Sequence, residues 1–124
     1  MKNLNPVCWF DIHVSNLENA KTFYETVLDT KLTDLPPEWG KQSTFPFENN
    51  GANATGALVE SNKFVNSGSN TIIYFASKDC LTEQNKVENA GGKIIKNKTP
   101  IGEFGFISLF SDIDGNIIGL HSKE

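Results

Sequence analysis

Alternating apolar and polar side chains mark the first element of the chain. Residues 5–14 alternate at every second position, which predicts a half-buried strand with an apolar face and a mixed face. The apolar face carries Phe10, Ile12 and Val14, and the mixed face carries Trp9, Asp11 and His13. Because side chains two positions apart on a strand share a face, we expect the three mixed-face residues to be neighbours.

A helical pattern follows this strand directly. Ser15 and Glu18 have the spacing of a capping box, and an apolar stripe predicts that the helix lies on the apolar face of the strand. The stripe consists of Leu17, Ala20, Phe23, Tyr24, Val27 and Leu28. Three short strands are then expected: one that stops at Pro36-Pro37, an edge strand with Phe45 and Phe47, and a strand over residues 55–60.

The same order of elements returns in the second half. A strand is predicted over residues 71–77 and a helix over 80–90, with Gly91-Gly92 as a left-handed cap. Three more strands are expected at Ile94-Ile95, over 104–110 and over 117–121, with a turn at 112–116 between the last two. The cap at Asn16 recurs at Asp79, and the strand start at Lys31-Leu32 recurs at Lys93-Ile94, with nearly the same spacing. This repetition indicates a duplicated unit and places any site between the halves.

The pattern therefore predicts an α+β fold of two tandem βαβββ modules. We expect one domain over residues 1–124, with the first module at about 4–60, a polar linker at 61–69 and the second module at about 70–122. A chain of 124 residues has the usual length of one domain.

Composition narrows the classes of function. The formal net charge is −4 with scattered lysines, which argues against a nucleic-acid partner or an anionic lipid surface. No apolar run approaches the ~20 residues that cross a bilayer, and the first residues lack the pattern of a signal peptide, so we expect a cytoplasmic protein without a membrane partner. Cys8 and Cys80 do not have metal-site spacing and are expected to be reduced thiols.

Several segments together resemble the vicinal oxygen chelate superfamily, which includes glyoxalase I, bleomycin-resistance proteins and extradiol dioxygenases. The segments are AKTFYETVL, TGALVE, TIIYF, ENAGGKII and GEFGFISLFSDIDGNIIGLHS, and the resemblance covers nearly the whole chain. It is greatest to small uncharacterised glyoxalase-like members. The resemblance implies that the two modules form a curved mixed sheet around a ligand cavity, which the inner faces of the sheets line. It also implies a homodimer.

The resemblance also implies a divalent metal held by four side chains, one from the first and one from the fourth strand of each half. The positions in this sequence that match are Trp9, Glu60, Ile72 and Gly119. Of these, only Glu60 can bind a metal, whereas Zn²⁺, Fe²⁺ or Ni²⁺ needs three or four N, O or S ligands. We therefore expect no metal cofactor. A shifted set of Asp11, His13, Glu60 and His121 is the alternative that would hold Zn, Ni or Fe.

The expected function is that of a glyoxalase or bleomycin-resistance-like protein, metal-free, that binds a small aromatic or cationic molecule in the cavity between the modules. The expected ligand-binding residues are Trp9, Asp11, His13, Glu60, Tyr74 and His121, with Phe106 as a further candidate wall. The alternative is a metal-dependent lyase, isomerase or dioxygenase that uses His13, Glu60 and His121. The sequence leaves open whether the protein is an enzyme. If it is, His13 and Glu60 are the candidate acid and base.

Overall fold

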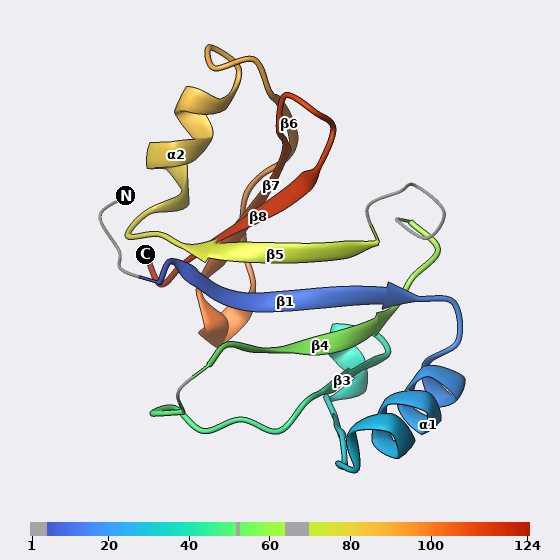
Figure 1. Ribbon diagram of the computed structural model, residues 1–124. Helices are drawn as coiled ribbons and strands as arrows, with labels where there is room; N and C mark the ends of the chain where they lie inside the picture. Colours follow the sequence, from blue (N-terminus) through green and yellow to red (C-terminus); the bar gives the residue numbers. More distant parts are fainter. Residues whose placement is uncertain (1–4, 52, 64–69) are drawn as a thin grey trace. The chain divides into compact units, whose positions relative to one another are not determined.

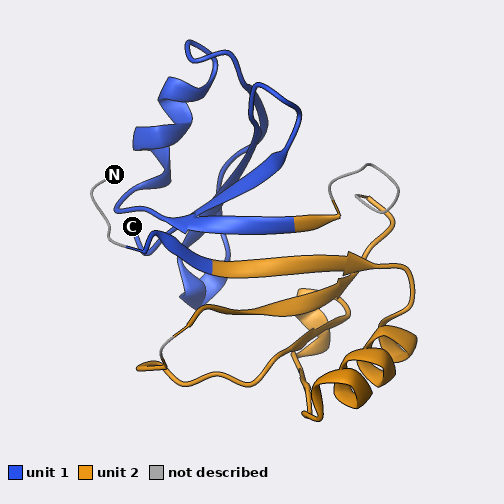
Figure 2. Cartoon of the chain, in the orientation of Figure 1, with its two compact units in different colours: residues 1–8, 72–124 blue, residues 9–71 orange. Residues whose placement is uncertain are grey.

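The computed structural model describes residues 5–51, 53–63 and 70–124 (Figure 1). These residues form two compact units: one is Trp9–Thr71, and the other joins the residues up to Cys8 with Ile72–Glu124 (Figure 2). Most of the predicted linker, residues 64–69, lies outside the described residues, as does residue 4 at the predicted start of the first module. Neither helix of the described chain is long and apolar enough to cross a membrane.

The unit Trp9–Thr71 holds the first βαβββ module. Its elements are β1 (Val7–Val14), α1 (Leu17–Leu28), β2 (Thr33–Asp34), the 3-10 turn η1 (Pro37–Trp39), β3 (Gln42–Thr44) and β4 (Thr55–Glu60). The strand order is β2-β3-β4-β1, in which β1 runs parallel to β4 and the other pairs are antiparallel. The first and last strands of the module are therefore neighbours in its sheet, and α1 connects β1 to β2 at the far edge.

The other unit repeats this plan. It contains β5 (Thr71–Ala76), α2 (Cys80–Val87), β6 (Lys93–Pro100), the 3-10 turn η2 (Gly102–Phe104), β7 (Phe106–Ser111) and β8 (Ile117–Ser122). The order is β5-β8-β7-β6, with β5 parallel to β8 and the other pairs antiparallel. The predicted α+β class and the duplicated βαβββ order are confirmed.

Both helices begin at a residue that caps backbone N–H groups with its side chain. Asn16 accepts a hydrogen bond from the N–H of Asn19 at 2.9 Å, and Asp79 accepts one from the N–H of Leu81 at 2.9 Å. The two repeated caps are therefore confirmed. The capping box predicted for Ser15 and Glu18 is wrong, because the cap lies one residue later, where the backbone is extended (φ −143°, ψ 111°) before the helix starts.

Three other boundaries differ from the prediction. The edge strand predicted around Phe45 and Phe47 is formed by Gln42–Thr44 instead, and Pro46, which has no N–H to donate, lies just beyond it. Helix α2 ends at Val87, before the expected residue 90, and the chain turns through Gly91 with φ 102°. The strand expected at Ile94-Ile95 extends over Lys93–Pro100, with irregular pairing to β7.

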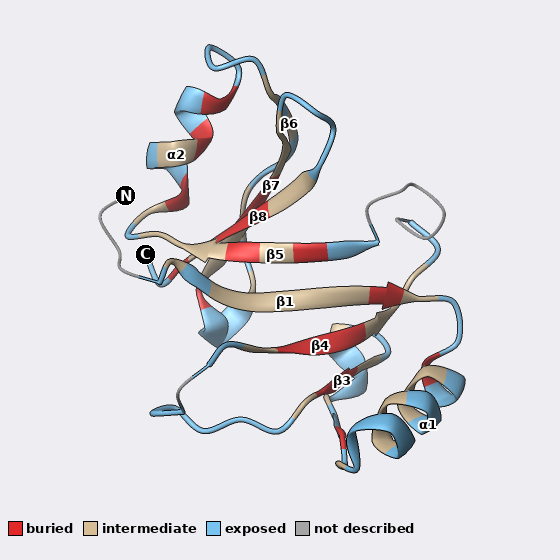
Figure 3. Cartoon of the chain, viewed as in Figure 1, coloured by how far each residue is buried: buried red, intermediate tan, exposed pale blue. Residues whose placement is uncertain are grey.

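The core of the first unit lies between α1 and one face of its sheet. Leu17, Leu32 and Leu58 are its buried centre, and Ile12, Val14, Ala20, Tyr24 and Phe45 pack around them. The helix therefore lies on the predicted face of β1, and Figure 3 shows that the middle of β4, residues 56–58, is buried. The outer part of the predicted stripe is exposed, however: Phe23, Val27 and Leu28 keep 58%, 62% and 55% of their surface.

Candidate functional site

The pairing of β1 with β4 decides which side chains share a face. Trp9, Asp11 and His13 pair with Thr55, Ala57 and Val59, respectively. The alternate residues Ile12 and Val14 pack in the core beneath α1. Because successive side chains of a strand point to opposite faces, Trp9, Asp11 and His13 lie on the face turned away from α1. We call this surface, formed by Trp9, Asp11 and His13 with their β4 neighbours, the Trp9 face.

The first two polar groups of the Trp9 face are directly bonded. The indole Nε1–H of Trp9 donates to Oδ1 of Asp11 at 2.8 Å. A hydrogen bond from a fixed donor stabilises a carboxylate in its ionised form. The bond therefore fixes the edge of the indole against a negative charge and orients the ring beside it.

His13, the third residue of the Trp9 face, is nearly buried, with 8% of its surface exposed. Burial lowers the pKa of its imidazole, because the charged form loses hydration. The charge of Asp11 opposes this effect and the charge of Lys63 adds to it. The balance favours a neutral imidazole at pH 7, able to donate from one ring nitrogen and accept at the other.

Glu60, the fourth predicted residue of this module, lies on the opposite face. It pairs with Val14, and its Oε1 accepts the N–H of Leu17 at 2.9 Å, at the first turn of α1. The Nζ of Lys41 lies 3.6 Å from Oε2 of Glu60, as an ion pair. Glu60 therefore holds the start of the helix, and the structure does not bring it together with Asp11 or His13.

Gln42 and Trp39 are neighbours of the Trp9 face that the sequence did not place there. Gln42 pairs with Val59, which pairs with His13, so the three residues form one row across β3, β4 and β1. The side-chain amide of Gln42 donates to the backbone carbonyl of Trp39 at 2.8 Å, which attaches η1 to this row. A register across three strands is not visible in the sequence, whose pattern predicts this edge strand at Phe45 and Phe47 instead.

Tyr74 and His121 belong to the other unit, where they lie on the sheet face turned away from α2. Tyr74 pairs with Gly119, and a Cβ on Gly119 would lie 2.3 Å from the Tyr74 ring, so the ring covers this glycine. His121 is on the same face, and its Nε2 donates to the carbonyl oxygen of Phe104 at 2.6 Å. Ile72, two residues before Tyr74, is completely buried.

Phe106, the other candidate wall, points to the α2 side of the sheet. It pairs with Ser122, whose hydroxyl accepts the N–H of Cys80 at the start of α2 at 3.2 Å. The ammonium group of Lys98 lies 4.5 Å from the centre of the Phe106 ring. Phe106 therefore does not share a face with Tyr74 and His121.

The residues at the metal positions do not fit a transition-metal centre. Trp9, Ile72 and Gly119 offer no side-chain electron pair for a metal, and the Glu60 carboxylate is bonded to the start of α1. The shifted set fails for the same reason, because Glu60 and His13 lie on opposite faces and His121 uses Nε2 for a carbonyl oxygen. Among residues 5–51, 53–63 and 70–124, no three His, Cys, Asp or Glu side chains gather as a metal-binding group.

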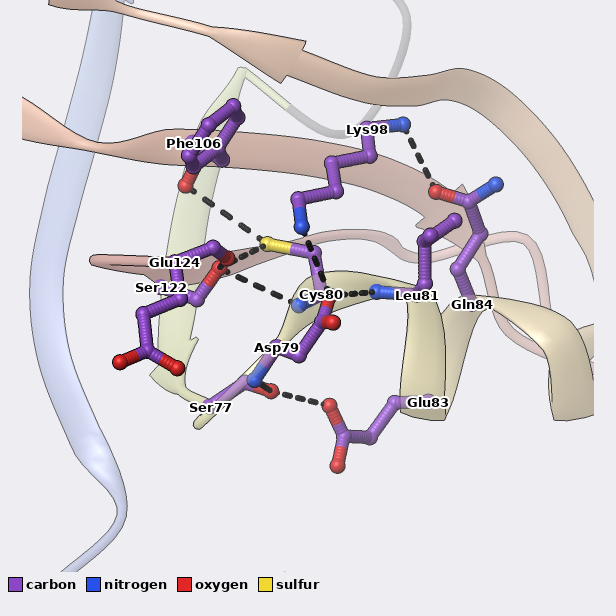
Figure 4. Close-up of polar contacts among 10 residues, drawn as sticks. All are labelled: Ser77, Asp79, Cys80, Leu81, Glu83, Gln84, Lys98, Phe106, Ser122 and Glu124. Atoms are coloured by element: carbon purple, nitrogen blue, oxygen red, sulfur yellow. Dashed lines mark hydrogen bonds and ion pairs between the residues drawn. The ribbon is translucent and has the colours of Figure 1, made fainter.

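The start of α2 is a structural cluster around Cys80 (Figure 4). The thiol is completely buried, lies 3.2 Å from the Ser122 hydroxyl and donates to the carbonyl of Phe106 at 3.6 Å. Asp79 accepts a bond from the ammonium group of Lys98 at 2.8 Å. These contacts join α2 to β6, β7 and β8.

Cys8, the other thiol, also forms no disulfide. Burial raises the pKa of this thiol, which favours the unreactive protonated form.

An open groove of about 350 Å³ runs between α2 and the hairpin of β7 and β8. Its walls are mainly apolar and include Val87, Phe110 and Ile113. None of the predicted site residues lines it.

The sequence profile of the Glyoxalase/Bleomycin resistance protein/Dioxygenase superfamily matches residues 7–120. The chain belongs to this superfamily. A search of curated protein sequences finds no significant match.

Solved structures with the glyoxalase fold include a Streptomyces coelicolor methylmalonyl-CoA epimerase variant, bound to 2-nitronate-propionyl-CoA. It has a TM-score of 0.68 and 17% identity and covers 97% of this chain and 98% of its own. The epimerase of Mycobacterium tuberculosis gives a TM-score of 0.67 at 13% identity, with 98% and 89% covered. A Legionella pneumophila protein described as an NAD-dependent benzaldehyde dehydrogenase gives 0.65 at 15% identity, with 94% and 98% covered. At these identities the similarity shows the fold alone.

Proposed function

We propose that this glyoxalase-superfamily chain binds a small organic molecule on the Trp9 face, without a metal at the positions that the family resemblance assigns. The observation that carries the proposal is the hydrogen bond of 2.8 Å between the Trp9 indole and the Asp11 carboxylate. The bond joins a flat apolar ring to a charged group, and His13 adds an imidazole on the same face of β1. Binding sites combine such apolar walls with a few fixed polar groups.

The donor chemistry supports a binder over a metal-dependent isomerase, lyase or dioxygenase. Such an enzyme needs at least three convergent N, O or S ligands, and the residues at the expected positions supply a single carboxylate, which already accepts the N–H of Leu17. Several structural relatives are methylmalonyl-CoA epimerases, which makes a metal-dependent isomerase the function to test against.

Acid-base catalysis by His13 and Glu60 has no support in the geometry. Their side chains start from opposite faces of the sheet of β1 and β4, so Glu60 cannot return a proton to a group that His13 contacts. Asp11 is the only carboxylate on the face of His13 among the paired residues of β1 and β4. Within the proposed function, His13 is therefore a hydrogen-bonding group of the ligand site.

Metal analysis of protein purified without an affinity tag tests the choice between the two functions. We expect less than one transition metal per ten chains after the protein is incubated with Zn²⁺, Ni²⁺ or Fe²⁺ and then desalted, as a roughly millimolar or weaker site would give. One retained metal per chain that disappears in a His13→Gln variant would overturn the metal-free proposal.

Fragment screening tests the site itself. Compounds that bind should shift the Trp9 indole and His13 imidazole signals in NMR spectra, and Trp9→Ala should abolish these shifts at His13. Phe23→Ala is the matched control, since it removes an exposed aromatic side chain of α1, which covers the other face of the sheet. Binding that survives Trp9→Ala unchanged would place the ligand elsewhere.

A further inference from the structure

We infer that the groove between α2 and the β7–β8 hairpin is the surface through which two copies of this chain associate, with Ile113 of each copy seated in the groove of the other. The inference goes beyond the proposed ligand site, since the groove contains no residue of the Trp9 face. It assigns a surface to the homodimer that the family resemblance implies. Three features carry it: an apolar hole, an exposed apolar side chain beside it and a rim with charges of both signs.

The groove supplies the hole. It has a volume of about 350 Å³, and Val87 and Phe110 are among the apolar side chains that line it. A Cβ on Gly92 would overlap the carbonyl oxygen of Ser111, so the chain that leaves α2 lies directly against the end of β7. An apolar groove that faces water gains free energy when another apolar surface covers it.

Ile113 supplies the side chain that fits such a hole. It keeps 75% of its surface exposed, the highest fraction among the large apolar side chains of the described residues. Its turn is fixed, because Oδ1 of Asp112 accepts the N–H groups of Asp114 and Asn116, each at 2.9 Å. A Cβ on Gly91 would lie 3.1 Å from Cγ2 of Ile113, so the base of the side chain rests on that glycine. Little freedom is therefore lost when Ile113 is bound.

A hole and an exposed side chain on the same surface match a second copy of that surface. In a twofold interface the same patch serves both partners, so that Ile113 of one copy meets the groove of the other and the reverse. A small molecule fits less well, because small-molecule sites enclose about 70–90% of their ligand, whereas this groove is open and Ile113 would stay exposed to water.

The charges around the groove are also self-complementary. Glu83, Lys86 and Asp112 line it together with the apolar residues. A rim with one sign of charge would repel its own copy, whereas a mixed rim lets Lys86 of one copy lie beside a carboxylate of the other. Lys86 forms no ion pair with the residues at 5–51, 53–63 and 70–124 of its own chain, so its ammonium group is available for this contact.

Sedimentation velocity over a concentration series tests the surface. We expect the natural chain to dimerise with a dissociation constant of about 1 μM. Ile113→Glu and Ala90→Glu should each raise this constant about tenfold or more, because each places a carboxylate in the apolar contact. Val27→Glu is the matched control, since it adds the same charge at an exposed apolar position of α1, and should change the constant by less than about twofold.

A second pair of variants tests the charges. Lys86→Glu makes the rim uniformly negative and should raise the dissociation constant about tenfold. Lys96→Glu, on an exposed residue of β6 outside the groove, makes the same change of charge and should have less than about a twofold effect.

Cross-saturation NMR maps the interface of the natural chain and so does not depend on how the variants fold. In dimers of a deuterated, ¹⁵N-labelled chain with an unlabelled chain, we expect amide signals to lose intensity at residues 86–92 and 110–113. Residues 19–27 of α1 should keep their intensity.

Three outcomes would overturn the inference: a monomer at every concentration, a dimer that survives both Ile113→Glu and Ala90→Glu, or cross-saturation confined to residues outside the groove. The proposed ligand site is read separately, at the Trp9 and His13 signals, and none of these outcomes removes it.

Discussion

Asp29 ends helix α1 in the left-handed region, with φ 50° and ψ 57°. The repeat predicted this conformation, because Gly91 stands at the equivalent exit of the second module and has φ 102°. A side chain with a Cβ is strained there, whereas glycine is not. We expect Asp29→Gly to raise the free energy of unfolding by about 0.5–1 kcal/mol, less the entropy that glycine adds to the unfolded chain.

Urea unfolding of two variants measures this effect. Asp29→Ala is the matched control, because it removes the same carboxylate but keeps the Cβ, and it should be about 1 kcal/mol less stable than Asp29→Gly. If Asp29→Gly and Asp29→Ala had equal free energies of unfolding, the left-handed backbone at residue 29 would not strain a side chain.

Asp11 acts on His13 through its charge. The carboxylate raises the pKa of His13 against the larger lowering by burial. Asp11→Asn should therefore lower the pKa of His13 further, as followed by NMR titration of its ring protons. Trp9→Phe removes the hydrogen bond to Asp11 but keeps its charge, and should change this pKa less. An unchanged titration in Asp11→Asn would show that the two side chains are not coupled.

At the scale of the element, Glu60 stabilises the first turn of α1. The N–H of Leu17 and, to a lesser extent, Lys41 lower the pKa of its carboxyl group. Because the folded protein then binds a proton less readily than the unfolded chain, this stabilisation is present above the usual pKa of glutamate. It is lost as the pH falls through the lowered value.

Glu60→Gln should accordingly lower the stability at pH 7, and the difference from the natural chain should shrink between pH 5 and pH 3. Urea unfolding at several pH values measures it, and Glu38→Gln, on an exposed residue of η1, is the control. A difference that stayed constant with pH would mean that the carboxylate charge is not involved.

The contact of β5 with β8 depends on the absence of a side chain at Gly119. An added Cβ would lie 2.3 Å from Cδ2 of Tyr74. We expect Gly119→Ala to lower the free energy of unfolding by about 1–3 kcal/mol, the usual effect of overpacking. In a Tyr74→Leu background the same change should be milder, since the ring is gone. Additive effects in this double-mutant cycle would contradict the contact.

At the scale of the whole molecule, we propose a homodimer, which the family resemblance implies. Light scattering at micromolar concentration should give twice the chain mass of 13.7 kDa. A monomer mass over the whole concentration range would remove the dimer from the proposal.

The sequence identified most of the fold and only part of the site. Local signals sufficed for the helix caps at Asn16 and Asp79, for the strand over residues 55–60 and for the common face of Trp9, Asp11 and His13. The local signals failed where a contact between residues far apart in the sequence decides the structure. Pro46 follows β3 instead of belonging to it, and Glu60 turned to the start of α1, because four unpaired N–H groups at a helix start attract a carboxylate.

The sequence by itself determined the duplicated βαβββ order and the scarcity of metal ligands, because periodicity and residue type are local properties. Only the tertiary structure decided which face each polar side chain serves. A strand offers two faces, and the pairing of β1 with β4 and the packing of α1 select one for Asp11 and the other for Glu60. Those contacts join residues more than forty positions apart in sequence, a distance at which pattern carries no information about neighbours.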